Sequence, residues 1–171
     1  MSLELRLIQA ADELGPVAAL TGEYVEWVHG RVLADAGVDL PFESDRELFL
    51  DLDGIREPRA RLYLAELDGE PVGTGGLRPL SGDDAEIKRM YVRPSARGQG
   101  VGRAILQRLV DDARALGFRA IHLDSGPWMH EAHALYRSFG FVPGTPQEGF
   151  EFESVPGVSE FAVFMRLDLA P

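Results

Sequence analysis

The residues best suited to hold a ligand form one glycine-rich stretch, Arg97-Gly98-Gln99-Gly100-Val101-Gly102. Glycines at alternate positions remove the side chains from a short loop, so that a ligand can approach its backbone closely. The loop follows a strand-like run and leads into an amphipathic helical pattern, whose first amide groups have no partners within the helix. Those amides and the positive end of the helix dipole favour an anion, and phosphate is the natural anion for such a site.

Two common phosphate motifs do not fit this loop. Arg103 stands where a dinucleotide-binding motif needs its third glycine, and the chain has no Gly-Lys-Ser/Thr sequence, which excludes a P-loop. A glycine-rich turn without a ligand is the alternative. The strand–loop–helix context favours a phosphate-binding loop of another type.

The distribution of charge supports a phosphate ligand. The formal net charge of −11 argues against a general nucleic-acid binder. Residues 88–119, however, hold eight basic and two acidic residues, a net charge of +6, whereas residues 1–60 have a net charge of −8. A solvated helix face explains Arg108 and Arg114 in this basic segment, but it does not explain Arg97. The positive charge surrounds the glycine loop, where a polyphosphate would be attracted.

Several other chemistries are excluded or disfavoured. The chain has no cysteine, so it has no disulfides, thiolate metal sites or cysteine nucleophile. No serine lies in a Gly-x-Ser-x-Gly motif. His130 and His133 are three residues apart without an obvious third ligand, so we predict no metal site. If the protein is a transferase, direct transfer between two bound substrates is therefore expected.

Length and composition predict a single domain over residues 1–171, and the order of helical and strand patterns predicts mixed α/β structure. The 171 residues, 45% of them hydrophobic, suffice for one core. No apolar run approaches the ~20 residues that span a bilayer, and the N-terminus lacks the layout of a signal peptide. We therefore expect a cytoplasmic protein without membrane association, which the absence of cysteine also suits.

The hydrophobic periodicity predicts the elements that position the loop. A helix is expected from Ala11 to about Ala36, broken or bent near Gly22 and Gly30. A short helix or a mobile loop is expected over 39–53, and Asp68-Gly69 predicts a hairpin turn. The remaining strands are expected at 3–8, 61–67, 71–80, 85–93, 120–124 and 161–167, and the remaining helices at 101–116 and 128–139.

Two segments resemble the GNAT superfamily of acetyl-CoA-dependent N-acetyltransferases. The first runs from Glu86 to Gly102, and its Arg97, Gly100 and Gly102 match the family's Arg/Gln-x-x-Gly-x-Gly/Ala motif. The second is Ala134-Leu-Tyr-Arg-Ser-Phe-Gly-Phe141. The resemblance covers about residues 62–141, with its motifs in the right order and at the right spacing.

The resemblance implies the GNAT fold, a central, mixed and mostly antiparallel sheet flanked by about four helices. That sheet opens in its middle after the strand at 85–93, and acetyl-CoA occupies the opening. The pyrophosphate would lie on the amides of the glycine loop, and the pantetheine arm would pair with the backbone of the preceding strand. The implied cofactor-binding residues are Met90, Tyr91, Val92, Arg97, Gly98, Gln99, Gly100, Val101 and Gly102.

The resemblance also implies catalytic residues. Tyr136 resembles the family's general acid, because a phenol with a pKa of roughly 10 stays protonated at neutral pH; a packing tyrosine is the alternative. Glu86 is the candidate general base, acting directly or through water, with an ordinary strand glutamate as its alternative. Many relatives carry an Asn seven residues before the Tyr, where this chain has Met129. Ser125 or backbone groups are candidates to replace that contact.

Together these features predict an N-acetyltransferase that transfers the acetyl group of acetyl-CoA to a primary amine, without a metal. The acceptor would be a small-molecule amine or a protein or peptide amine, and the protein a monomer or a homodimer. A non-catalytic acyl-CoA-binding sensor is the alternative. Trp27 and Trp128 would either line the acceptor pocket or belong to the core, and His122 is expected to be a hydrogen-bonded sheet histidine.

Overall fold

The computed structural model describes residues 1–9, 13–39, 57–80, 82–147 and 157–169. Within these residues the chain forms one mixed sheet of seven strands, in the order β1-β2-β3-β4-β5-β7-β6. The strands are β1 (Leu3–Leu7), β2 (Arg61–Leu67), β3 (Glu70–Pro79), β4 (Asp84–Val92), β5 (Ala120–Ser125), β6 (Val142–Pro143) and β7 (Val163–Asp168). The helices are α1 (Gly15–Ala36), α3 (Val101–Ala115), α4 (His130–Ser138) and α5 (Val158–Phe161), with a 3₁₀ turn η3 (Pro94–Ala96).

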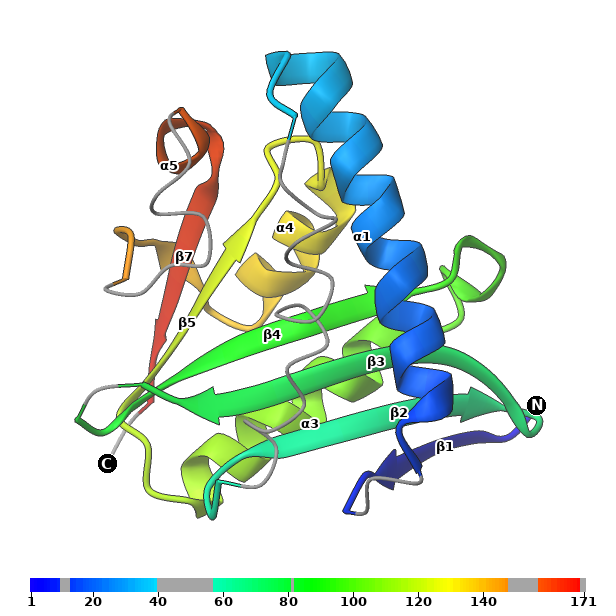
Figure 1. The fold of residues 1–171 in the computed structure, drawn as a ribbon. Coiled ribbons are helices and arrows are strands. Elements are labelled where there is room, and N and C mark those ends of the chain that lie inside the picture. The colour runs from blue at the N-terminus through cyan, green and yellow to red at the C-terminus, as the bar shows by residue number, and fades with distance from the viewer. Residues whose placement is uncertain (10–12, 40–56, 81, 148–156, 170–171) are drawn as a thin grey trace.

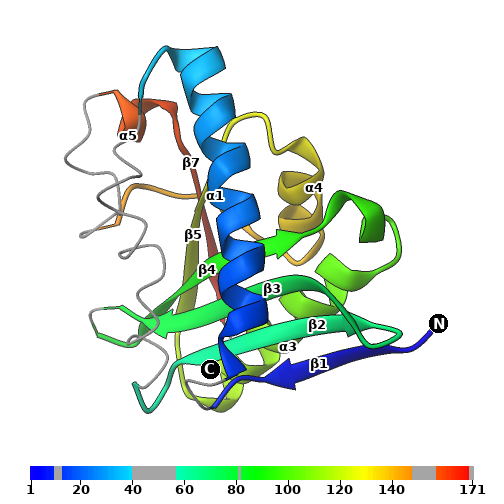
Figure 2. The ribbon, with the colours of Figure 1, turned by 45° about the vertical axis from the view of Figure 1, so that its right-hand side comes forward.

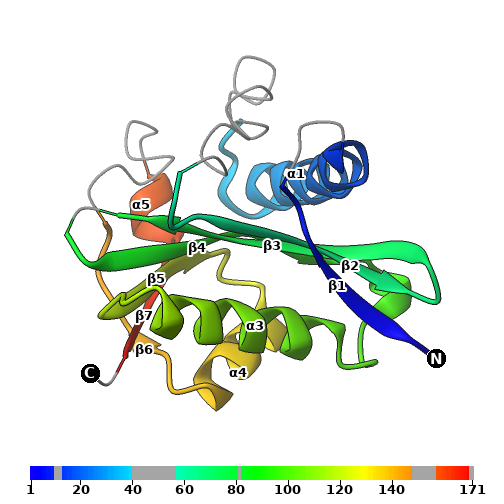
Figure 3. The same ribbon diagram turned by 90° about the horizontal axis from the view of Figure 1, so that it is seen from below.

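The helices cover the two faces of the sheet unequally. Seen from below, α1 and α5 lie on one face and α3 and α4 on the other (Figure 3). The main core lies between the sheet and α3, where Ile105, Leu106 and Leu109 are fully buried against inward-facing strand residues. A separate cluster around Leu20, Leu62 and Leu64 packs α1 onto the opposite face.

The sheet opens between its two central strands, as predicted. All neighbouring strands are antiparallel except β4 and β5, which are parallel and pair only from Asp84–Glu86 to Ala120–His122. Beyond these pairs β4 and β5 diverge, and the views in Figures 1 and 2 show α4 beside the opening. The carboxyl-terminal halves of β4 and β5 are therefore not paired with each other.

Local sequence signals explain the elements around the opening. Asp68 and Gly69 both have positive φ (51° and 86°), which is the geometry that a two-residue hairpin between β2 and β3 requires. The apolar face of α3 is buried, which confirms the predicted amphipathic helix. Helix α3 ends before Gly117, whose φ of 78° suits glycine.

A β-bulge interrupts β4 beside the opening. The register with β3 shifts between Thr74 and Gly76, so that Gly75 faces the two residues Arg89 and Met90. Arg89 has a φ of 57°, which is uncommon for a residue other than glycine. Bulges bend the strand and redirect side chains, and they are frequent beside binding sites.

The structure corrects three sequence predictions. Helix α1 is not broken at Gly22 or Gly30, because burial of Val17, Leu20 and Val32 outweighs the ~1 kcal/mol that each glycine costs. The last strand begins at Val163 rather than at Phe161, since residues 158–161 form the short α5 after Gly157, whose φ is 84°. The two-residue strand β6 was not predicted, because so short a segment carries no periodicity. The prediction for 39–53 falls almost entirely outside the described residues.

Candidate active site

One cavity of about 640 Å³ fills the opening between β4 and β5. It reaches from the glycine loop and the start of α3, past β4, β5 and α4, to side chains of α1 and α5. The cavity therefore joins a loop suited to phosphate with a region lined by side chains from α1, α4 and α5. This size and this mixture of apolar walls with a few polar groups are typical of small-molecule sites.

The glycine loop has the geometry of an anion site. Gly98 and Gly100 have φ angles of 74° and 84°, and a Cβ built on either would meet nothing within 4 Å. Gly100 caps α3 without a side-chain hydrogen bond, and the first helical bond runs from the amide of Ala104 to the carbonyl of Gly100. The amides of residues 101–103 consequently lack partners within the helix, and they are available to a ligand.

Most of the predicted cofactor-binding residues line this cavity. Gln99 is the exception, and its side chain instead donates to the carbonyl of Ser95 (3.0 Å). Arg97 is held by a hydrogen bond from Nε to the carbonyl of Val92 (3.1 Å). The residues of the predicted set that line the cavity are Met90, Tyr91, Val92, Arg97, Gly98, Gly100, Val101 and Gly102.

Thr21 offers a polar group that sequence reasoning did not single out. It lies on α1, it lines the cavity and it is 2% exposed. Its hydroxyl oxygen is buried and has no hydrogen-bond partner among the described residues. A buried, unpaired hydroxyl is costly, so this atom fits a cavity that takes a polar ligand.

Tyr136 lies on the buried face of α4, at the wall of the same cavity. Its hydroxyl donates to the sulfur of Met90 at 3.8 Å, a weak contact that a better acceptor can replace. Burial raises the pKa of Tyr136 well above its ordinary value, and the carboxylate of Asp124 raises it further. The phenol is therefore neutral, and it is a hydrogen-bond donor at physiological pH.

Two carboxylates contact one lysine at the apex of the opening, which is the point where β4 and β5 stop pairing, just beyond Glu86 and His122. Nζ of Lys88 lies 2.8 Å from Oδ1 of Asp124 and 3.2 Å from Oε1 of Glu86. Arg78 approaches the other oxygen of Glu86 at 2.8 Å, and the Glu86 side chain is only 4% exposed. Lys88 and Asp124 line the cavity, whereas Glu86 does not. Any contact between Glu86 and a ligand would therefore run through Lys88 or water.

The matched family and relatives agree with this geometry. Residues 9–141 match the family model described as "Acetyltransferase (GNAT) family". The chain belongs to this family. It is 38% identical over 125 residues to an "IAA acetyltransferase" of Azospirillum brasilense. The aligned segment covers 67% of this chain and 82% of the relative.

Solved structures show the same fold. The crystal structure of a "putative acyl-CoA N-acyltransferase" from Klebsiella pneumoniae has a TM-score of 0.73 at 23% identity, and the match covers 98% of both chains. A PaiA N-acetyltransferase from Thermoplasma acidophilum, solved in complex with coenzyme A, has a TM-score of 0.74 at 16% identity. It covers 99% of this chain and all of its own. The GNAT fold predicted from the sequence is therefore confirmed.

Met129 stands where the family resemblance implies an Asn, and the structure of this GNAT chain shows what surrounds that position. The hydroxyl of Ser125 donates to the Met129 sulfur (3.2 Å), and its oxygen lies 3.1 Å from Nε2 of His133. Burial lowers the pKa of His133, and the charges of Arg137 and His130 lower it further. Ser125 lines the cavity, so a hydroxyl fixed by a neutral histidine stands beside the position of the absent Asn.

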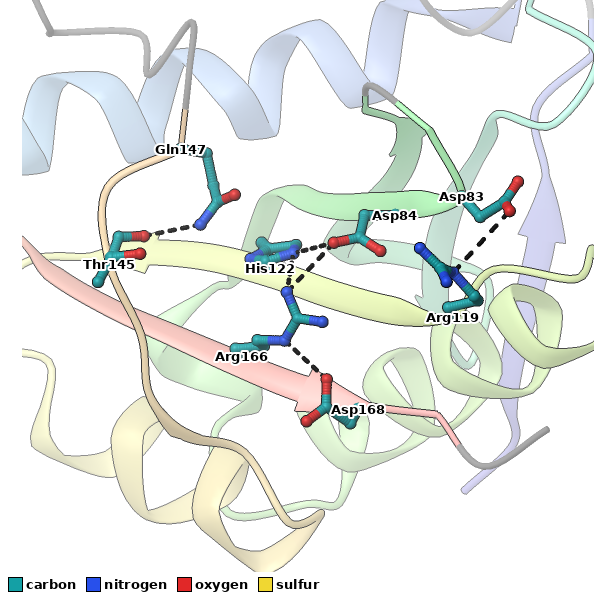
Figure 4. A network of polar contacts seen from close by, with 8 residues as sticks. All are labelled: Asp83, Asp84, Arg119, His122, Thr145, Gln147, Arg166 and Asp168. Carbon is teal, nitrogen blue, oxygen red and sulfur yellow. Dashed lines mark hydrogen bonds and ion pairs between the residues drawn. The ribbon is translucent and has the colours of Figure 1, made fainter.

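A row of polar residues crosses the GNAT sheet on the face away from the main core. Glu86 on β4 is paired in register with Arg78 on β3 and His122 on β5, and His122 with Arg166 on β7. Figure 4 shows His122, Asp84 and Arg166 in mutual contact; Nε2 of His122 lies 2.7 Å from the Asp84 carboxylate. Sequence reasoning predicted a hydrogen-bonded His122, and this contact provides the bond, although Nδ1 has no partner among the described residues. These contacts connect β4, β5 and β7 in the part of the sheet where β4 and β5 are still paired.

Sequence reasoning missed Asp124 and Lys88 as members of the GNAT cavity. Lys88 is the only lysine of the chain, but this fact alone does not indicate a chemical role. The fold brings its ammonium next to Asp124. Among the described residues no group of three or more His, Cys, Asp or Glu is arranged to hold a metal ion. None of the described helices is long and apolar enough to cross a membrane.

Proposed function

We propose that this GNAT protein transfers the acetyl group of acetyl-CoA to a primary amine by direct attack, with both substrates bound together. The observation that carries the proposal is the single cavity between β4 and β5. It contains an anion-binding loop at one end, a neutral buried phenol and a carboxylate at its apex, and a second region beyond them. Such a cavity can hold two substrates in one chamber and orient their reacting groups.

The residues that would hold acetyl-CoA fit that molecule. The unpaired amides of residues 101–103, with Arg97 and Arg103 beside them, suit the pyrophosphate. The β4 bulge places the backbone of Met90, Tyr91 and Val92 along the cavity wall, where an amide-containing arm can pair with it. The unpaired hydroxyl of Thr21 is a further polar partner. When bound, acetyl-CoA supplies an acyl group already activated as a thioester.

Tyr136 is proposed as the general acid. Its raised pKa keeps the phenol protonated, so that the hydroxyl can donate a hydrogen bond and then a proton to a departing sulfur. The present acceptor of that hydroxyl is the sulfur of Met90, which shows that the group points toward a soft acceptor on β4.

Glu86 is proposed as the general base, acting through water rather than by direct contact with the amine. Its carboxylate shares Lys88 with Asp124, so a water at the cavity wall can connect it to the amine. Asp124 is a second candidate for the same role because its side chain lines the cavity itself. Exchanging each carboxylate for its amide separates the two.

The test is an assay of thiol release from acetyl-CoA with a panel of primary amines, together with mass analysis of the amine products. The proposal predicts that thiol release requires an amine and that the acetylated amine forms in equal amount. Binding of acetyl-CoA without any amine-dependent thiol release would favour the acyl-CoA sensor instead.

A further inference from the structure

The end of the cavity away from the glycine loop is lined by aromatic rings. We define the aromatic chamber as the part of the cavity lined by Tyr24 and Trp27 of α1, Trp128 before α4, and Phe161 of α5. The ring centroids lie 6.3 Å apart for Tyr24–Trp27, 6.4 Å for Trp27–Trp128 and 5.5 Å for Trp128–Phe161. The four rings therefore form one continuous wall.

This wall is not part of the main core. The rings of Tyr24, Trp128 and Phe161 pack around a small cluster whose buried members are valines, apart from the core between the sheet and α3. None of the four rings is fully buried, and Trp27 is 37% exposed. Rings that only stabilise a fold are usually covered, whereas these rings present accessible surface to the cavity.

Trp128 is held in place by the backbone beneath it. A Cβ built at Gly126 would lie 2.5 Å from the indole ring, so the ring rests directly on this glycine. Any larger residue at this position would displace the indole. The chamber wall is thus a defined surface, which favours a rigid, flat partner over a flexible one.

Two arginines lie beside the rings. The guanidinium carbon of Arg31 lies 5.5 Å from the Trp128 ring centroid, and that of Arg97 lies 5.7 Å from the Trp27 ring centroid. Arg31 is ion-paired with Asp35 at 2.7 Å, so the charge of Arg97 is the one that would repel a second positive charge on the acceptor. A single ammonium is tolerated at the apex, where Asp124 lies.

From these observations we infer that the acceptor is a monoamine carried by an aromatic ring, whose ring lies in the aromatic chamber while its amine reaches the apex between β4 and β5. This inference rests on the proposed acetyl transfer. It adds the substrate class, which the cofactor end of the cavity does not determine.

The test compares 2-phenylethylamine with n-butylamine and spermidine as acceptors. We expect kcat/KM for 2-phenylethylamine to exceed that for n-butylamine at least ~10-fold, because a ring filling an apolar pocket gains more than a short chain. Trp27→Ala should remove most of this advantage, so that the ratio of the two kcat/KM values falls toward one. Leu33→Ala is the matched control, because Leu33 is 47% exposed on the same helix and does not line the cavity.

A binding measurement separates this inference from the proposed function. Calorimetry of 2-phenylethylamine with the protein saturated with coenzyme A should show binding that Trp27→Ala weakens and Leu33→Ala preserves. Such binding without turnover would retain the aromatic site and reject acetyl transfer. Equal kcat/KM values for the ring and chain amines, a preference for spermidine, or ring binding that survives Trp27→Ala would each overturn the inference.

Discussion

Lys88 and Asp124 form an ion pair across the opening between β4 and β5, with Nζ 2.8 Å from Oδ1. The pair lies just beyond the last paired residues of these strands, Glu86 and His122. Because Lys88 also contacts Glu86 at 3.2 Å, its single ammonium connects a carboxylate inside the cavity with one outside it. Both carboxylates therefore belong to one network of charged groups.

Glu86→Gln tests which carboxylate accepts that proton. If Glu86 is the base, the variant should lose most rate at or below about pH 7, where amines are mostly protonated, and the loss should shrink toward the pKa of the acceptor. Asp124→Asn is the companion variant, measured in the same pH–rate profiles. An unchanged profile for Glu86→Gln beside a reduced one for Asp124→Asn would transfer the role to Asp124.

Gly100→Asp tests the phosphate site. The added carboxylate would lie where the loop and the helix dipole favour an anion. Open space surrounds Gly100, and Asp is one of the few residues that adopt a positive φ, although at some cost in stability. Acetyl-CoA should raise the Tm of the wild type and leave that of the variant unchanged. Gly100→Asn is the control, since Asn tolerates positive φ and adds no charge. A normal Tm shift in Gly100→Asp would contradict the phosphate assignment.

The sequence predicts the glycine-loop end of the cavity better than the region where β4 and β5 separate. Loop, strand and helix around Gly100 lie close together in the chain, so local glycine spacing and periodicity suffice to predict them. Lys88 lies on β4 and Asp124 on β5, and α3 separates these two strands in the sequence. Their contact depends on where β4 and β5 separate in the sheet. The aromatic chamber brings together side chains from both ends of the chain, such as Trp27 and Phe161, which no local pattern connects.

His133→Gln should change how stability depends on pH. Burial lowers the pKa of His133 in the folded protein, so below about pH 6.5 the unfolded chain binds a proton more readily than the folded one. The free energy of unfolding should therefore fall as the pH drops from about 6.5 toward the lower pKa of the folded state, and this part of the fall should disappear in the variant. Urea unfolding between pH 7.5 and 5.5 measures it. Identical pH dependence in both proteins would show that His133 does not contribute.

Tyr136→Phe keeps the ring and its packing and removes the proposed proton donor. Turnover should fall by roughly 10²–10⁴, the range typical of losing one general acid, while acetyl-CoA affinity changes little. Tyr63→Phe is the matched control, because Tyr63 is also buried but donates to Asp112 (2.6 Å) away from the cavity. It should lose about 1–2 kcal/mol of unfolding free energy and no turnover. Turnover of Tyr136→Phe within about twofold of the wild type would indicate a packing tyrosine, provided that chemistry limits the rate.

The most direct measurement is the initial rate of thiol release with acetyl-CoA and the amine varied together. Attack on acetyl-CoA within one cavity requires both substrates to be bound, so double-reciprocal plots at several amine concentrations should intersect. Parallel lines would mean that the acetyl group first moves to the protein, as in a covalent mechanism. That result would contradict direct transfer in the cavity between β4 and β5.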